Sequence, residues 1–144
     1  MPKAYYSTVF DQPAGRVWAR IRDFGDYEWA GTGYQAWMED GRAGDAVGGV
    51  RTFRRDDGTL VGQRLRAHSD VDRSYTYEFC EPSPFPVRDY EATLRVTPVV
   101  DGDRAFVEWW ATFECAAEER DRWTAQFNEG FAGWLHSLRG RLGG

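Results

Sequence analysis

The strongest constraint on the fold is a two-residue alternation of apolar and polar side chains between residues 73 and 115. In the segment 89–97 every second residue is apolar: Tyr90, Ala92, Leu94 and Val96. Segments 73–81 and 105–115 alternate in the same way. Because side chains of a strand point to opposite faces in turn, each segment predicts a strand with one buried and one exposed face.

Four further strands are predicted at 3–10, 35–39, 50–55 and 60–68. The sequence Asp56-Asp57-Gly58 between the last two is typical of a hairpin turn. Together the strands predict one curved antiparallel sheet of seven strands. Its apolar face must be covered by another element.

Two helices are predicted. The first covers 14–24, where Asp11 can cap the start and Pro13 fits the first turn. The second covers 117–142 and carries an apolar stripe: Trp123, Phe127, Gly130, Phe131, Trp134, Leu138 and Leu142. The chain contains no repeat or linker. We therefore predict a single α+β domain over residues 1–144, in the order β-α-β6-α, in which the sheet wraps around the C-terminal helix; a further short helix can follow the first.

Aromatic residues make up 16% of the chain, a heavy load for one small domain. The parity of the strands places six rings on the inner face of the sheet: Phe53, Tyr75, Tyr77, Phe79, Tyr90 and Trp109. Large rings on both sides either fill the core or hold the helix away from the sheet. We favour the second interpretation, which predicts a cavity of several hundred Å³ between the sheet and the helix stripe. Inward tyrosine hydroxyls also need polar partners, which a polar-lined pocket supplies.

Charge and motif content exclude several classes of function. The net charge of −5 argues against a nucleic-acid partner. No segment has the length of apolar sequence that a membrane span needs, and the first residues do not resemble a secretory signal, so we expect a cytoplasmic protein without membrane insertion. The two cysteines, Cys80 and Cys115, lack metal spacing and are expected as reduced thiols. We predict no metal and no cofactor, and we expect His68 and His136 at the surface or at its boundary.

Six segments carry a resemblance to a known family, and they occur in its order: DQPAGRVW at 11–18, RDFG at 22–25 followed by Trp29, VRTF at 50–53, QRL at 63–65, PVRDYEATLRV at 86–96 and VEWWATFE at 107–114. Together they resemble the SRPBCC or START-like helix-grip superfamily, and within it the polyketide cyclase/dehydrase branch. Plant abscisic acid receptors and birch-pollen allergens are distant members. The resemblance implies a helix-grip fold with a deep hydrophobic cavity between the curved sheet and the C-terminal helix.

A proline-rich loop precedes the strand that contains Tyr90. Three prolines lie within the sequence PSPFP at 82–86. The resemblance implies that this loop lies at the mouth of the cavity, with Phe85 and Val87 turned toward the ligand. Proline reduces the entropic cost of ordering such a lid.

Arg51 and Gln63 are the polar candidates inside the cavity. Strand parity places Arg51 on the face of Phe53 and Gln63 on the face of Leu65. Relatives often carry glutamate where this chain has Gln63. Arg51 is then free to bind a ligand carboxylate, enolate or phenolate, or it pairs with a carboxylate such as Glu28 or Glu39, or it points to solvent.

The sequence leaves two classes of function open. One is an enzyme that promotes cyclisation or dehydration of a polyketide-like or aromatic substrate, with Arg51 and Tyr90 as the candidate catalytic residues. The other is a carrier or sensor of a hydrophobic small molecule. In both cases the ligand contacts are predicted to be Phe53, Gln63, Leu65, Tyr75, Tyr77, Phe79, Phe85, Val87, Ala92, Leu94, Trp109, Ala111, Trp123, Phe127, Phe131 and Trp134. Parity places Trp110 on the outer face, where an exposed ring could mark a dimer contact, so a monomer and a homodimer both remain open.

Overall fold

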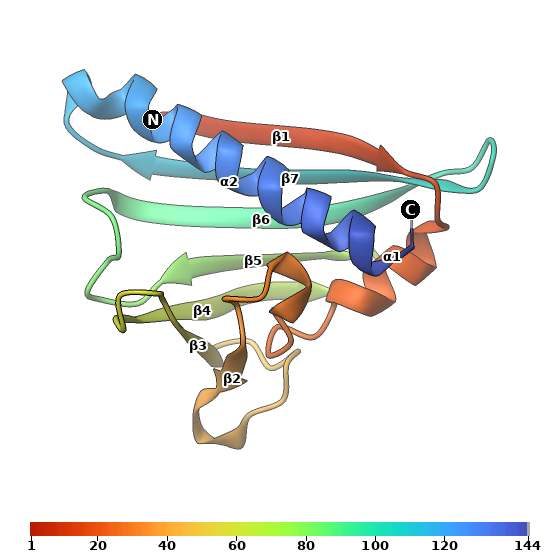
Figure 1. Cartoon of the computed structure of the whole chain (residues 1–144), viewed down its shortest axis with the longest axis horizontal. Helices are drawn as coiled ribbons and strands as arrows, with labels where there is room; N and C mark the ends of the chain where they lie inside the picture. Colours follow the sequence, from red (N-terminus) through yellow and green to blue (C-terminus); the bar gives the residue numbers. More distant parts are fainter. Residues whose placement is uncertain (144) are drawn as a thin grey trace.

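The seven predicted strands form a single antiparallel sheet, with the order β1-β7-β6-β5-β4-β3-β2. The computed structural model describes residues 1–143. Figure 1 shows the long C-terminal helix lying diagonally across one face of this sheet. The strands are β1 (Lys3–Phe10), β2 (Ala36–Met38), β3 (Val50–Arg54), β4 (Leu60–Ser69), β5 (Ser74–Phe79), β6 (Arg88–Val99) and β7 (Arg104–Glu114). The predicted fold class is confirmed.

The helices differ from their predicted boundaries. They are α1 (Ala14–Ile21), the short 3-10 helices η1 (Glu28–Ala30), η2 (Glu39–Gly41) and η3 (Ala117–Glu119), and α2 (Arg120–Arg141). The first helix was expected to reach Phe24 but ends at Ile21. Its continuation is prevented because the Phe24 N–H donates to Gly44 O at 2.9 Å and the Asp23 carboxylate accepts the Gly25 N–H. Pro13 occupies the N-cap position without a side-chain hydrogen bond, so the expected cap by Asp11 does not form.

Alternation of burial follows the predicted strand parity. In β6 the buried residues are Tyr90, Ala92, Leu94 and Val96. The pairing of the strands aligns inward residues in rows across the sheet, so that Leu65, Tyr77, Ala92 and Ala111 lie side by side. Trp110 lies on the outer face, where Lys3 and Arg95 cover its ring with cationic groups 5.6 and 5.4 Å from its centroid.

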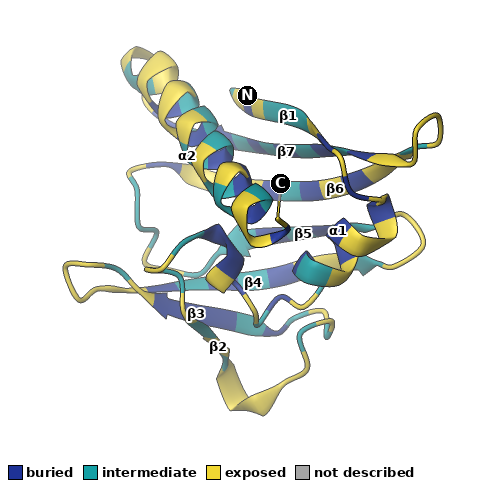
Figure 2. Ribbon diagram, turned by 45° about the vertical axis from the view of Figure 1, so that its right-hand side comes forward, coloured by how far each residue is buried: buried dark blue, intermediate teal, exposed yellow. Residues whose placement is uncertain are grey.

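Rings of α2 pack directly on the sheet. Phe127 contacts Phe113 and Tyr90, with ring centroids 5.1 Å apart in both pairs. Phe131 stacks on Trp109 at 4.9 Å with an angle of 16° between the planes. The buried face of α2 is visible in Figure 2 as the side that meets the strands. Rings therefore fill the space along this part of the interface, where we had expected a cavity.

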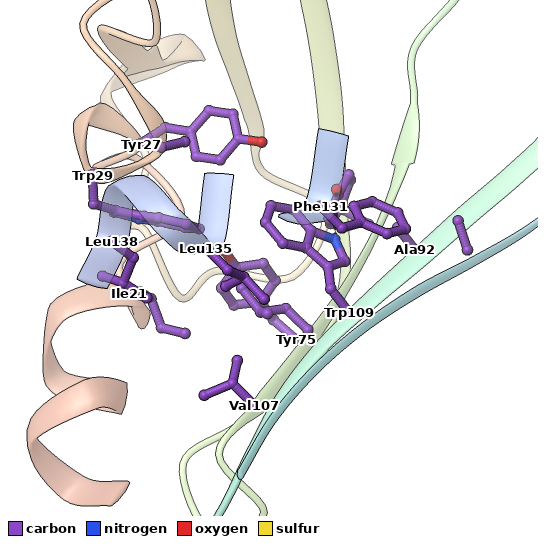
Figure 3. Packing of buried hydrophobic residues seen from close by; sticks show 14 of the residues in the cluster. Ile21, Tyr27, Trp29, Tyr75, Ala92, Val107, Trp109, Phe131, Leu135 and Leu138 are labelled. Atoms are coloured by element: carbon purple, nitrogen blue, oxygen red, sulfur yellow. Dashed lines mark hydrogen bonds between the residues drawn. The ribbon is translucent and has the colours of Figure 1, made fainter. Parts of the chain in front are cut away.

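Trp29 fills a second part of the predicted cavity. It extends from η1, is fully buried, and lies 5.9 Å from the ring of Trp109. Figure 3 shows Trp29 beside Leu135 and Leu138 of α2. The expected helix stripe lacked Leu135, which is 1% exposed. The open space is consequently displaced from the middle of the helix toward the β3 and β4 side of the sheet.

None of the helices within residues 1–143 combines the length and the apolar character that crossing a membrane requires.

Candidate functional site

A cavity of about 600 Å³ opens between the loop after α1 and the β3–β4 side of the sheet. Helix α2 contributes Trp134 to one wall, and the proline loop contributes Pro84 and Phe85 to another. The complete lining is Tyr27, Gly31, Thr32, Gly33, Tyr34, Phe53, Arg55, Asp56, Val61, Gln63, Phe79, Pro84, Phe85 and Trp134. The charged side chains in this set are Arg55, which directly follows β3, and Asp56, which lies in the hairpin turn.

Five of the residues predicted from the sequence lie on the cavity wall: Phe53, Gln63, Phe79, Phe85 and Trp134. The other predicted residues are buried away from it: Arg51, Leu65, Tyr75, Tyr77, Val87, Tyr90, Ala92, Leu94, Trp109, Ala111, Trp123, Phe127 and Phe131. Most of this second group face inward as strand parity requires. They do not reach the cavity because α2 and η1 pack against them directly.

Sequence reasoning missed the segment 27–34, which supplies one entire wall. Tyr34 connects this segment to the other walls. The centroid of its ring lies 5.4 Å from that of Phe53 and 5.8 Å from that of Trp134. Its hydroxyl accepts a hydrogen bond from Trp134 Nε1 at 2.9 Å. Gly31 permits this placement, because a Cβ there would approach Cδ2 of Tyr34 to 3.3 Å and its φ is 153°. The segment has no periodicity; its glycines at 31 and 33 were the available signal.

Phe85 lines the cavity from the proline loop. Its ring lies 5.9 Å from Phe79 and 5.5 Å from both Trp123 and Phe127. The Ser83 hydroxyl donates to Phe85 O at 2.8 Å and holds the backbone of this turn. Phe85 is only half-buried, as expected of a lid residue. Val87, by contrast, is buried in the core and does not line the cavity.

Arg51 and Gln63, which were expected inside the cavity, meet inside the protein, but only Gln63 reaches the cavity wall. They are paired across β3 and β4, and Arg51 Nε donates to Gln63 Oε1 at 2.7 Å. Arg51 is 0% exposed and Gln63 is 4% exposed. Arg51 Nη1 also donates to Phe24 O at 3.3 Å, whereas Nη2 finds no hydrogen-bond partner among the described residues.

The two carboxylates considered as partners of Arg51 are engaged elsewhere. Glu39 accepts a hydrogen bond from the Thr52 hydroxyl at 2.7 Å, and Glu28 pairs with Arg141 at 3.4 Å. No salt bridge to Arg51 forms within residues 1–143.

Aromatic rings surround the Arg51 guanidinium instead. Its central carbon lies 4.0 Å from the Phe24 ring centroid and 3.7 Å from that of Tyr27. A guanidinium over an aromatic face is attracted by the ring quadrupole and is more weakly hydrated than an ammonium. The protein therefore holds a buried cation with one amide, one carbonyl and two stacked rings.

The buried tyrosines are neutral phenols at neutral pH. Burial raises the pKa of Tyr27 and Tyr77 well above the usual value, and it also raises the pKa of Tyr75 and Tyr90. The nearby Arg51 cation opposes this rise without cancelling it. Tyr90 has its ring stacked on Phe79 at 4.4 Å, which places it behind the cavity wall.

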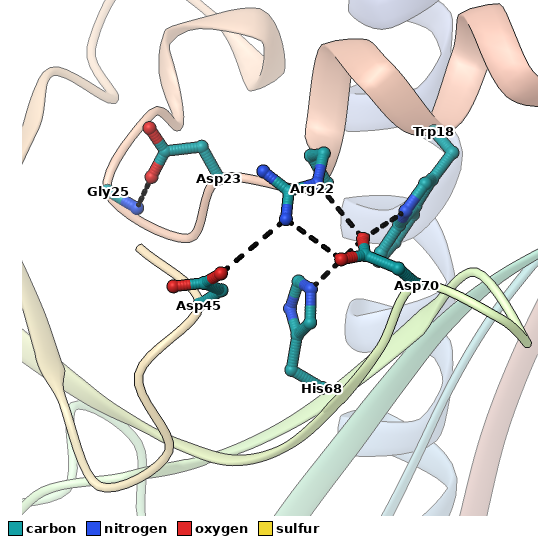
Figure 4. Close-up of polar contacts among 7 residues, drawn as sticks. All are labelled: Trp18, Arg22, Asp23, Gly25, Asp45, His68 and Asp70. Carbon is teal, nitrogen blue, oxygen red and sulfur yellow. Dashed lines mark hydrogen bonds and ion pairs between the residues drawn. The ribbon is translucent and has the colours of Figure 1, made fainter. Parts of the chain in front are cut away.

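A second polar cluster lies outside the cavity and joins α1 to the turn after β4 (Figure 4). Arg22 donates two hydrogen bonds to Asp70, both at 3.0 Å, and Trp18 Nε1 donates a third at 2.8 Å. These bonds, with the Arg22 contribution largest, hold the pKa of Asp70 well below its usual range. His68 Nε2 lies 3.3 Å from the same carboxylate, at the boundary of the protein, while His136 is exposed. The cluster fixes α1 to the sheet.

No group of three or more His, Cys, Asp or Glu side chains in the described part of the chain is arranged to hold a metal ion. Cys80 and Cys115 are free thiols.

A curved antiparallel sheet that grips a long C-terminal helix, with an aromatic cavity at one side, defines a helix-grip protein. The sequence model of the family described as "Polyketide cyclase / dehydrase and lipid transport" matches residues 1–142, so the chain belongs to this family. This result confirms the resemblance found in the sequence. The family and the fold suggest binding of hydrophobic ligands.

Solved structures agree with this assignment. A solution structure of a Thermobifida fusca protein is 28% identical, covers 99% of this chain and 94% of its own, and has a TM-score of 0.86. A protein from Nitrosospira multiformis is 30% identical, with 96% and 94% covered and a TM-score of 0.79. A crystal structure of a Bacillus thuringiensis protein, 24% identical over 96% and 97% of the two chains, shares the fold with a TM-score of 0.83. No curated protein matches this sequence.

Proposed function

We propose that this protein binds an aromatic or polyketide-like small molecule in the cavity that Phe53, Gln63, Phe85 and Trp134 line. The observation that carries the proposal is the cavity of about 600 Å³, in which six of the fourteen lining residues are aromatic and one of them, Phe85, is half-buried. Ligand sites of drug-sized molecules occupy roughly 300–1,000 Å³ and combine apolar walls with a few polar groups. The volume and the lining both fit a drug-sized aromatic molecule.

A carrier or sensor is the function that this geometry supports best. General acid–base catalysis needs a group whose pKa is close to the working pH and which reaches the substrate. Tyr90 lies behind Phe79, and its pKa is raised by burial. Arg51 lies behind Gln63 rather than on the wall. Both candidate catalytic residues are thus separated from the space where a ligand would sit.

A cyclase or dehydrase activity is the second candidate. The family description favours it, and an electropositive group close to the cavity would stabilise an enolate as it forms. In this account Arg51 acts at a distance, and substrate folding by the cavity walls supplies most of the rate enhancement. An experiment that detects binding addresses the first candidate without depending on turnover.

The test uses the fluorescent probe anilinonaphthalene sulfonate with a variant that fills the cavity. Val61 is buried on the cavity wall, whereas its neighbour Leu60 lies on the opposite face of β4 and is 53% exposed. Val61→Phe should reduce probe binding at least tenfold, and Leu60→Phe should leave it unchanged. Equal binding by both variants, each with a wild-type melting temperature, would place the probe outside this cavity and overturn the proposal.

A further inference from the structure

The hydrogen bond between Arg51 and Gln63 fixes the orientation of the Gln63 amide. A guanidinium has five N–H donors and no acceptor, so the amide atom that faces it must be the carbonyl oxygen. The distance of 2.7 Å from Arg51 Nε to Gln63 Oε1 is that of a short, charge-assisted bond. The opposite orientation would bring an N–H group against a cation. Because the guanidinium can only donate, the Gln63 carbonyl oxygen faces Arg51 and the amide nitrogen lies on the other side.

The amide nitrogen of Gln63 is consequently directed away from Arg51. Gln63 belongs to the cavity wall, and its Nε2 donates no hydrogen bond to any side chain or backbone group in residues 1–143. Nε2 is also absent from the buried polar atoms that lack a partner, so it retains contact with the open space. The wall thus presents an N–H donor beside the aromatic side chains of the cavity.

We propose that Gln63 Nε2 is the group that recognises the ligand, and that it selects a planar apolar molecule carrying a carbonyl or enolate oxygen. Arg51 is the positioning residue: it holds the amide in its donor orientation and lies behind it as a buried cation without a carboxylate partner. This inference rests on the proposed function, because it assigns a ligand class to the same cavity.

A second wall group reinforces the preference for an oxygen acceptor. Tyr34 Oη already accepts a hydrogen bond from Trp134 Nε1 at 2.9 Å, which leaves its own hydrogen available to donate. Tyr34 lines the same cavity as Gln63. Two donors on the same wall, with a cation behind one of them, favour an electron-rich oxygen over an N–H group, which can only donate.

The experiment compares fluorenone with fluorene, which share a tricyclic shape and differ by a carbonyl against a methylene group. Affinities are measured by displacement of anilinonaphthalene sulfonate from wild type and from four variants: Gln63→Glu, Gln63→Met, Arg51→Met and Arg51→Lys. In wild type the ketone should bind up to about tenfold more tightly than the hydrocarbon, the upper end of the range for a hydrogen bond between neutral groups. Gln63→Glu keeps a partner for Arg51 but offers only acceptors, and Gln63→Met keeps the volume without a donor.

Both Gln63 variants should reduce the ketone preference to about one- to twofold while fluorene affinity stays within twofold of wild type. Arg51→Met should do the same, because it frees the amide to rotate; Arg51→Lys, which restores a cationic donor, should recover part of the preference. A purely structural role for Arg51 would instead weaken fluorene and fluorenone equally.

The possible failures are distinct. If both compounds bind wild type with equal affinity, or if the preference survives in Gln63→Glu and Gln63→Met, the assignment to Gln63 is overturned and the proposed function stands. If neither compound nor the probe binds wild type, the proposed function and this inference are both overturned.

Discussion

Arg51 donates to Gln63 across β3 and β4 at 2.7 Å, and its guanidinium lies against the ring of Tyr27 at 3.7 Å. A buried cation without a carboxylate is costly unless each contact is well formed. The hydrogen bond between Arg51 and Gln63 therefore has two effects. It offsets part of the cost of burying the Arg51 cation, and it orients the polar amide that Gln63 presents to the cavity.

Arg51→Met should lower the free energy of unfolding by about 1–3 kcal/mol, because Gln63 Oε1 loses its donor while remaining nearly buried. The double variant Arg51→Met/Gln63→Leu should be more stable than the sum of the two single changes predicts, since it leaves neither partner unpaired. Urea unfolding of the four proteins measures this coupling. Additive effects within about 0.5 kcal/mol would show that the hydrogen bond contributes little.

Phe85→Ala should weaken the binding of anilinonaphthalene sulfonate with a loss of stability below about 1.5 kcal/mol. Phe85 is half-buried, so its removal opens a surface rather than an internal cavity. Phe127, which its ring contacts, provides the control: it is 3% exposed, and Phe127→Ala should cost about 3–5 kcal/mol. Similar losses of stability in the two variants would assign Phe85 to the core and not to a lid.

Asp70 should make the protein sensitive to acid. Its pKa is lower in the folded protein than in the unfolded chain, so its contribution is fully present above the unfolded value of about 4 and is lost as the pH falls below it. Melting temperatures between pH 7 and pH 2 should fall less steeply for Asp70→Asn than for wild type. Asp72→Asn is the matched control, because Asp72 follows in the same turn and forms none of the Asp70 contacts. If the melting temperatures of Asp70→Asn and wild type fell equally steeply with pH, the Asp70 carboxylate would not be the source of the acid sensitivity.

The buried tyrosines should resist ionisation. Because burial raises the pKa of Tyr75, Tyr77 and Tyr90, the folded protein holds these phenols neutral above the usual value of about 10. Stability should therefore fall as the pH rises beyond that value, where the unfolded chain releases these protons and the folded chain does not. Tyrosinate absorbance should rise in two stages, the second coinciding with loss of the near-ultraviolet circular dichroism. A single early stage that includes all seven tyrosines would contradict this.

The face of the sheet on which each strand residue lies could be predicted from the sequence. Strand parity placed Arg51 on the face of Phe53 and Gln63 on the face of Leu65, because the period of a strand is set by its backbone. The register that pairs Arg51 with Gln63 was not available from the sequence. The cavity position could not be obtained in this way. It depends on Trp29, which enters from η1, and on the wall segment 27–34, neither of which belongs to a periodic element.

In the long helix α2, too, some features could be predicted from the sequence and others could not. Its apolar stripe was visible in the sequence, yet Leu135 was missed and Trp134 proved to lie at the edge of the buried face. A rotation of the helix by a fraction of a turn exchanges such neighbours, and the packing of Phe131 against Trp109 determines that rotation. Periodicity identifies a face, but side-chain packing sets where it points.

The central claim, that an aromatic ligand occupies the cavity beside Gln63, is tested most directly by the indole N–H resonance of Trp134. This group donates to Tyr34 within the cavity wall, whereas Trp110 lies on the outer face of the sheet. In a titration of isotope-labelled protein with fluorenone followed by two-dimensional NMR, with assignments made from Trp134→Phe and Trp110→Phe, the Trp134 signal should shift and the Trp110 signal should stay in place. Saturable shifts at Trp110 with an unmoved Trp134 signal would contradict the account.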